Sequence, residues 1–155
     1  MYFQLTDLKL IKPLSYNKQR LLGVDLGDKT IGFSLSDTTW TIASPYESYK
    51  KISDQVTIFK FQKLIKEFEI AAIIMGYPLH MNGDESQQSQ KVIRFSEKLL
   101  KQCDRPILLW DERWSTMAVT RSLIEADLSR KKQKKVVDKM AASFILQGVL
   151  DALGH

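Results

Sequence analysis

Two uninterrupted apolar runs, Ile70–Met75 and Pro106–Trp110, constrain the fold of this chain more than any other feature. A strand that is buried on both faces, as in the parallel sheets of α/β proteins, has a continuous apolar sequence. Between the two runs, Val92, Phe95 and Leu99 recur at helical spacing. A helix that connects two buried strands predicts a right-handed crossover and a parallel pair.

The segment before these runs has the pattern of an antiparallel meander. Residues 21–26 form a short apolar run, and residues 31–36 alternate between large apolar side chains and Gly or Ser, which is the period of a half-buried strand. The segment Trp40–Tyr49 predicts a third strand, and Pro45 places it at a sheet edge or at a bulge.

These patterns together predict an α/β fold with a mixed five-stranded sheet, three antiparallel strands followed by two parallel strands, and helices on both faces. The length of 155 residues suits one domain. We divide it into an N-terminal arm, residues 1–20, and a single domain, residues 21–155. Apolar residues at helical spacing predict helices near residues 58–68, 92–99, 119–126 (with Ser115 as N-cap) and 134–153.

Composition excludes several classes of protein. No apolar run approaches the roughly 20 residues that span a bilayer, and the N-terminal sequence lacks the pattern of a signal peptide. The single cysteine, Cys103, excludes an intramolecular disulfide and a multi-cysteine zinc site. We therefore expect a cytoplasmic protein without a membrane anchor, in which carboxylates hold any metal ion.

The net charge of +5 comes from one short segment. Five of the six residues from 130 to 135 are basic, and Lys and Arg balance Asp and Glu in the remainder of the chain. A solvated loop and a phosphate-binding segment are both open interpretations. We predict that this basic segment contacts nucleic acid, together with an arginine after the last predicted strand; the residues are Arg130, Lys131, Lys132, Lys134, Lys135 and Arg113.

Two carboxylates near strand ends stand where the fold alone does not need them. Asp25 lies inside the first predicted strand on the same face as Gly23 and Gly27, and glycines in a strand often mark the close approach of a ligand or another backbone. Glu112 follows a buried strand, and ligands of open sheets collect at the carboxyl ends of the strands. The structural alternatives are a turn acid for Asp25 and a solvated strand end for Glu112.

A third carboxylate, Asp138, falls between Ile145 and Val149 on a helical wheel, in the middle of the apolar arc of the last helix. A carboxylate that faces a core is costly unless it is paired or bound to a metal. A buried salt bridge is one alternative, and the two other misplaced acids favour metal ligation. Three converging carboxylates suit Mg²⁺ or Mn²⁺, and such sites perform two-metal hydrolysis of phosphodiesters.

The segments that carry these acids also resemble a known family. In chain order they are GVDLGDKTIGFSLSD, IASP, IIMGYPLHMNGDE, LLWDERWST and SRKKQKKVVDKMAASFILQGVLDAL. This series, from about Leu21 to Leu153, is similar to the YqgF family, also called RuvX, whose members are described as Holliday junction resolvases and as nucleases of pre-16S ribosomal RNA. The resemblance implies a ribonuclease H-like fold, Mg²⁺ or Mn²⁺ as cofactor, and Asp25, Glu112 and Asp138 as the catalytic, metal-binding acids.

The function that the resemblance implies is a metal-dependent nuclease that processes the 5′ end of pre-16S ribosomal RNA. The alternatives are a resolvase of four-way DNA junctions and a nucleic-acid-binding module without activity. Asp25 and Gly27, followed by Thr30 and Gly32, also resemble the phosphate hairpin of actin-like and sugar-kinase-like proteins, but 155 residues leave no room for the second lobe of those proteins. The sequence leaves open whether the chain acts as a monomer or a homodimer.

Overall fold

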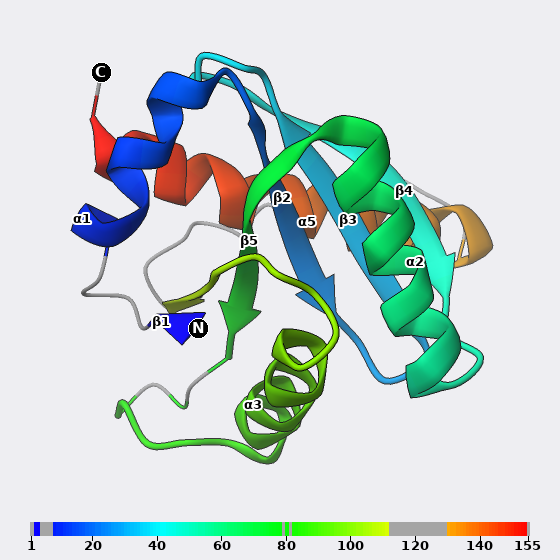
Figure 1. Cartoon of the computed structure of the whole chain (residues 1–155). Coiled ribbons are helices and arrows are strands. Elements are labelled where there is room, and N and C mark those ends of the chain that lie inside the picture. The colour runs from blue at the N-terminus through cyan, green and yellow to red at the C-terminus, as the bar shows by residue number, and fades with distance from the viewer. Residues whose placement is uncertain (1, 4–7, 79, 81, 112–129, 155) are drawn as a thin grey trace.

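The computed structural model describes residues 2–3, 8–78, 80, 82–111 and 130–154, and the side chains of these residues except 2–3 and 130–136 (Figure 1). The predicted helix after Ser115 lies outside the described residues. The elements in chain order are β1 (Tyr2–Phe3), α1 (Leu8–Ile11), the 3-10 helix η2 (Lys12–Asn17), β2 (Arg20–Leu26), β3 (Thr30–Ser36), β4 (Ala43–Lys50), α2 (Asp54–Phe68), β5 (Ile70–Tyr77), α3 (Gln87–Leu100), β6 (Ile107–Asp111) and α5 (Arg130–Leu153).

The strands form one mixed sheet in the order β1-β6-β5-β2-β3-β4. Strands β2, β3 and β4 are antiparallel neighbours, whereas β5 is parallel to both β2 and β6. The predicted mixed sheet of three antiparallel strands followed by two parallel strands is therefore confirmed. The structure adds β1, which pairs parallel with β6 at the far edge. The division into an arm and a domain at residue 20 stays a prediction.

The third strand begins later than its sequence predicted. Trp40 adopts a left-handed backbone conformation in a turn, and its indole Nε1 donates to the Gln19 carbonyl at 2.8 Å. The Asp37 carboxylate accepts the backbone N–H groups of Thr41 and Ile42 at 2.7 and 3.0 Å, which holds residues 37–42 in this turn. Strand β4 therefore starts at Ala43.

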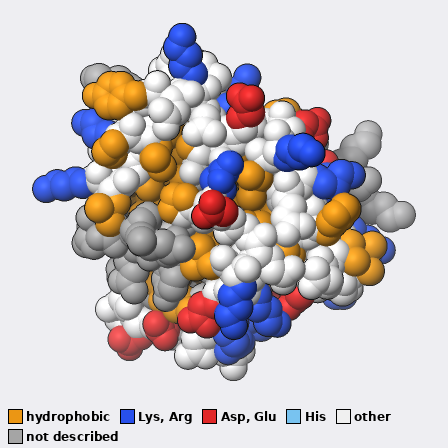
Figure 2. Space-filling model, in the orientation of Figure 1, with side chains coloured by type: hydrophobic (Ala, Val, Ile, Leu, Met, Phe, Trp, Pro, Cys, Tyr) orange, Lys and Arg blue, Asp and Glu red, His pale blue; other side chains and the backbone are white. Residues whose placement is uncertain are grey.

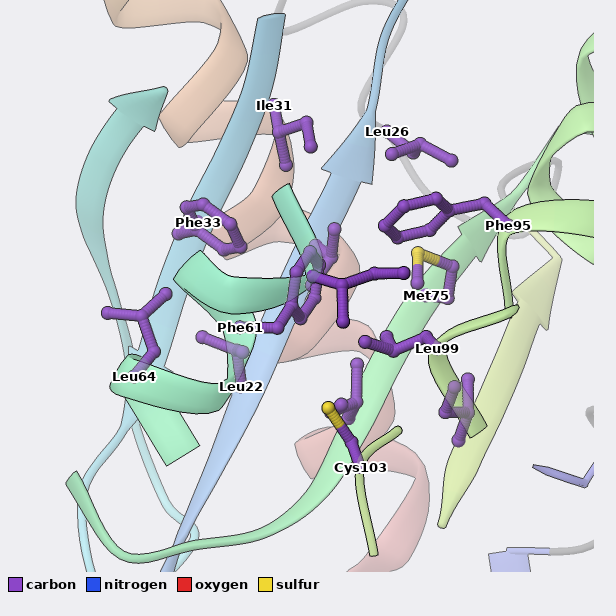
Figure 3. Close-up of a cluster of buried hydrophobic side chains, with 14 of the residues drawn as sticks. Leu22, Leu26, Ile31, Phe33, Phe61, Leu64, Met75, Phe95, Leu99 and Cys103 are labelled. Atoms are coloured by element: carbon purple, nitrogen blue, oxygen red, sulfur yellow. The ribbon is translucent and has the colours of Figure 1, made fainter. Parts of the chain in front are cut away.

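Helices cover both faces of the sheet, as predicted (Figure 1). Helices α2 and α3 pack on one face, where Phe33 and Phe61 meet edge to face with their ring centres 5.2 Å apart (Figure 3). Helix α5 covers the other face and crosses β2, β3 and β4. Ile11 of α1 is fully buried among the apolar side chains between α5 and the sheet.

Helix α5 starts at Arg130, four residues before the predicted start. The basic segment therefore forms the first turns of the helix rather than a preceding loop. Among the described residues, no helix combines the length and the apolar character needed to cross a membrane.

Candidate active site

Two glycines allow the backbone of α5 to lie directly on the sheet. A Cβ atom on Gly32 would lie 1.8 Å from the carbonyl oxygen of Asp138. A Cβ atom on Gly23 would lie 2.9 Å from the carbonyl oxygen of Ala142, which also accepts the Ser34 hydroxyl at 2.8 Å. Any larger side chain at either glycine would hold α5 away from β2 and β3.

This close approach brings Asp25 and Asp138 to the same place. Asp25 pairs with Gly32 across the β2–β3 ladder, and the Asp138 backbone covers Gly32. Both carboxylate residues are half-buried and line one hollow of about 530 Å³ near the carboxyl end of β2. The other lining residues are Leu26, Gly27, Asp28, Lys29, Thr30, Gly76, Pro78 and Gln88.

The Asp138 carboxylate is held by hydroxyl groups of the hairpin strands. Its Oδ2 accepts the Thr30 hydroxyl at 2.7 Å and the Ser48 hydroxyl at 3.4 Å. Ser48 is the partner of Gly32 in the β3–β4 ladder, so Asp25, Gly32 and Ser48 form one row across three strands. Among the described residues Asp138 forms no ion pair, and the buried salt bridge considered as an alternative is not present there.

Sequence reasoning did not assign Thr30 or Ser48 to the site. The available signal is the position of Thr30 at the end of the turn that follows Asp25, directly before the strand predicted over residues 31–36. No periodicity marks Ser48, because only the register between β3 and β4 places it next to Gly32.

The third predicted acid, Glu112, lies outside the described residues, as does Arg113. Strand β6 ends at Asp111, which pairs with Tyr77 of β5. The carboxyl ends of β2, β5 and β6 therefore lie at one edge of the sheet, and Glu112 directly follows the last residue of that edge in β6. Asp111 itself is buried. It shares a strand face with Leu109, which packs with α2 and α3, whereas Asp25 is on the α5 side.

The nucleic-acid contacts predicted for the basic segment stay a prediction. Its backbone forms the turns of α5 that precede Asp138 on the same helix, and its side chains lie outside the described ones. In the described chain, no three His, Cys, Asp or Glu residues gather into a cluster that could hold a metal ion. Oxygen-bearing side chains, among them Asp25, Asp138 and Thr30, line the hollow, and oxygen ligands are those that Mg²⁺ and Mn²⁺ prefer.

Comparison with known sequences finds relatives that match most of the chain. Residues 19–152 match the RuvX family, described as Holliday junction resolvase. A relative from Zymomonas mobilis is 41% identical over 146 residues, covering 94% of this chain and 89% of its own. One from Methylocella silvestris is 47% identical over 136 residues, covering 88% and 84%. Both carry the name "Putative pre-16S rRNA nuclease".

Comparison with solved structures supports the fold. The chain is similar to Thermus thermophilus RuvC in complex with a Holliday junction substrate, with a TM-score of 0.55 and 11% identity over 88% of this chain and 96% of that chain. It is also similar to the fowlpox virus resolvase in complex with Holliday junction DNA, with a TM-score of 0.52 and 14% identity over 88% and 100%. Because the family match and the relatives span most of its length, the chain belongs to the RuvX family.

Proposed function

We propose that this chain is a metal-dependent nuclease that hydrolyses phosphodiester bonds, and that it acts in the cytoplasm on the 5′ end of pre-16S ribosomal RNA. The observation that carries the proposal is the contact of α5 with Gly32, because it brings Asp138 beside Asp25 in one hollow. The names of the relatives from Zymomonas mobilis and Methylocella silvestris favour the ribosomal RNA precursor as substrate.

Asp25, Asp138 and Glu112 are the residues that would hold Mg²⁺ or Mn²⁺. Side chains along a strand alternate between the two faces of the sheet, and in β6 Leu108 and Trp110 lie on the α5 side. Glu112 comes two residues after Trp110, and this spacing is our reason for proposing it as the third ligand. Bound at these acids, two such ions would activate water and stabilise the leaving oxygen of the phosphodiester.

The protein's own groups would orient these ligands. The Thr30 hydroxyl donates to Oδ2 of Asp138 at 2.7 Å, and this bond would restrict the orientation of the carboxylate. Partners of metal ligands that act in this way commonly change metal affinity or activity about 10- to 100-fold when removed. Thr30 is therefore a positioning residue in this proposal.

The basic segment at the start of α5 would attract the nucleic acid strand to this hollow. Its five positive charges precede Asp138 on one helix, and positive charge near a phosphate chain adds affinity that does not depend on sequence. Arg113, directly after Glu112, would add to the same interaction.

A four-way DNA junction is the second candidate substrate. The RuvX description and the two junction complexes of similar fold favour it. The purified protein is therefore incubated with a pre-16S ribosomal RNA transcript and with a four-way DNA junction, each in Mn²⁺ and in EDTA. We expect cleavage of the RNA in Mn²⁺ and none in EDTA. Cleavage of the junction alone would favour the second substrate, and binding without any cleavage would identify a non-catalytic module.

A further inference from the structure

A second hollow, of about 180 Å³, lies between the β2–β3 turn, the start of α2 and the length of α3. Four basic residues and two acidic residues line it, so its formal charge is positive. The lining residues are Leu26, Gly27, Asp28, Lys51, Asp54, Gln88, Lys91, Arg94, Phe95 and Lys98. Lys and Arg side chains gather over this region of α3 and the start of α2 (Figures 1 and 2).

Two of the four basic side chains are engaged by the two acids. Lys91 lies 2.9 Å from Asp28, and Lys98 lies 2.8 Å from Asp54. The hydrogen bond and the charge of Lys91 lower the pKa of Asp28, and the hydrogen bond from Lys98 does the same for the pKa of Asp54 despite partial burial. Both acids are therefore ionised and neutralised by their own lysines at neutral pH.

The other two basic residues are in excess over the acids. Lys51 lines the hollow together with Asp28 and Asp54, and its positive charge contributes to lowering the pKa of both acids. Arg94 is exposed on α3, and among the described residues it forms no ion pair. Neither Lys51 nor Arg94 forms an ion pair with a described carboxylate, so the hollow carries two positive charges in excess of its acids.

This second hollow, called the basic hollow below, adjoins the hollow that Asp25 and Asp138 line, called the catalytic hollow. Leu26, Gly27, Asp28 and Gln88 line both. The Gln88 amide donates to the Leu26 carbonyl at 2.7 Å, which fixes the wall between them. From Gln88 to Lys98 the helix rises by about 15 Å, which is a path long enough for several phosphates of one strand.

We propose that the basic hollow binds the sugar–phosphate backbone of the nucleic acid strand where it leaves the catalytic hollow, with Lys51 and Arg94 contacting phosphates. The proposal rests on the proposed function in taking the Asp25–Asp138 hollow as the place of cleavage. Helix α3 and helix α5 cover opposite faces of the sheet. The strand is therefore held from both faces, by the α5 basic segment on one side and by this hollow on the other.

The test compares the double variant Lys51→Gln, Arg94→Gln with the matched control Lys63→Gln, Lys66→Gln, whose lysines are exposed on α2. Both lose two positive charges. Binding to a labelled single-stranded RNA is measured by fluorescence anisotropy over a salt series in EDTA, where the nuclease is inactive. Each lost phosphate contact reduces the slope of log affinity against log salt by about 0.7. We expect a reduction of about 1.4 in the double variant, about 0.7 in Arg94→Gln alone, and none in the control.

Equal slopes for the double variant and the control would overturn the inference. The binding measurement does not depend on cleavage. If the double variant shows the reduced slope and the parent protein cleaves no substrate, the basic hollow binds phosphates but the proposed nuclease function is wrong. If the parent cleaves and the double variant keeps the parental slope, the nuclease function stands and the inference about the basic hollow is wrong. Arg94→Gln keeps the test valid if Lys51→Gln disturbs folding, because Arg94 is exposed.

Discussion

Substitution Gly32→Ala is expected to separate α5 from the hairpin and to inactivate the protein. The new Cβ atom would lie 1.8 Å from the Asp138 carbonyl oxygen and 2.4 Å from its carbonyl carbon. Ordinary contact begins near 3.4 Å, so this turn of α5 must move by about 1.5 Å. Both partners are backbone atoms, and no side-chain rotation relieves the contact.

The displacement has two measurable consequences. Overpacking of this kind typically costs about 1 to 3 kcal/mol, which corresponds to a melting temperature lower by about 3 to 9 °C for a domain of this size. A misplacement of about 1 Å at a reacting group costs about 100-fold in rate. We therefore expect Gly32→Ala to reduce cleavage by 100-fold or more, because Asp138 moves away from Asp25.

The control is Gly148→Ala on the same helix. Its Cβ atom would lie 3.1 Å from the indole Nε1 of Trp110, a side-chain atom that needs to give by only a few tenths of an ångström. Melting is followed by circular dichroism and cleavage by single-turnover kinetics. A Gly32→Ala protein that cleaves and melts like the parent would refute the claim that α5 positions Asp138 through this contact.

Three further changes have defined outcomes. Replacing the five basic residues of the α5 segment with Gln should reduce the slope of log affinity against log salt on single-stranded RNA by up to about 3.5. A variant that keeps the slope of the parent protein would show that the segment is only solvated. Thr30→Val should lower kcat about 10- to 100-fold and Ser48→Ala less, because its bond is longer at 3.4 Å; an equal loss in both would contradict the positioning role of Thr30. Burial raises the pKa of Asp37, but hydrogen bonds from Thr39 and from the N–H groups of Ile42 and Thr41 outweigh it and lower the pKa to about 2. Asp37→Ala should therefore lower the free energy of unfolding by about 1 to 2 kcal/mol at pH 7. Urea unfolding should show the difference between parent and variant shrinking as the pH falls from about 4 to 2. A difference that stays constant over this range would show that the carboxylate charge does not cause it.

Much of the fold is predictable from this sequence because each buried element has a distinct periodicity. The apolar runs Ile70–Met75 and Pro106–Trp110 form the two parallel strands, and the alternation of residues 31–36 predicts the strand β3. That alternation predicts a half-buried strand, whereas β3 is buried on both faces because α5 covers the face of Gly32 and Ser34. The apolar arc of the last helix also predicts its packing on the sheet, since Ile145 and Val149 are fully buried there.

Other features depend on contacts that no local pattern records. Strand β4 begins at Ala43 because the Asp37 carboxylate binds two backbone N–H groups, a turn that the alternation of apolar residues does not reveal. The start of α5 was predicted four residues late because a run of lysines has no apolar periodicity.

The candidate site was partly predictable for a similar reason. A charged residue in an apolar pattern identifies Asp25 and Asp138, and the structure brings both to one hollow. The hydroxyl of Ser48 enters through strand register alone. Whether Glu112 joins them remains a prediction, because that residue lies outside the described part of the chain.

Single substitution of the three acids tests the central claim most directly. Asp25→Asn, Glu112→Gln and Asp138→Asn are compared with Asp151→Asn, an exposed residue about 20 Å along α5 from Asp138. Cleavage of pre-16S ribosomal RNA in Mn²⁺ and binding in EDTA are measured for each. We predict loss of cleavage with retained binding in the first three variants and parental cleavage in the fourth. Cleavage near the parental rate in Asp25→Asn or Asp138→Asn would contradict the assignment of that acid as a metal ligand.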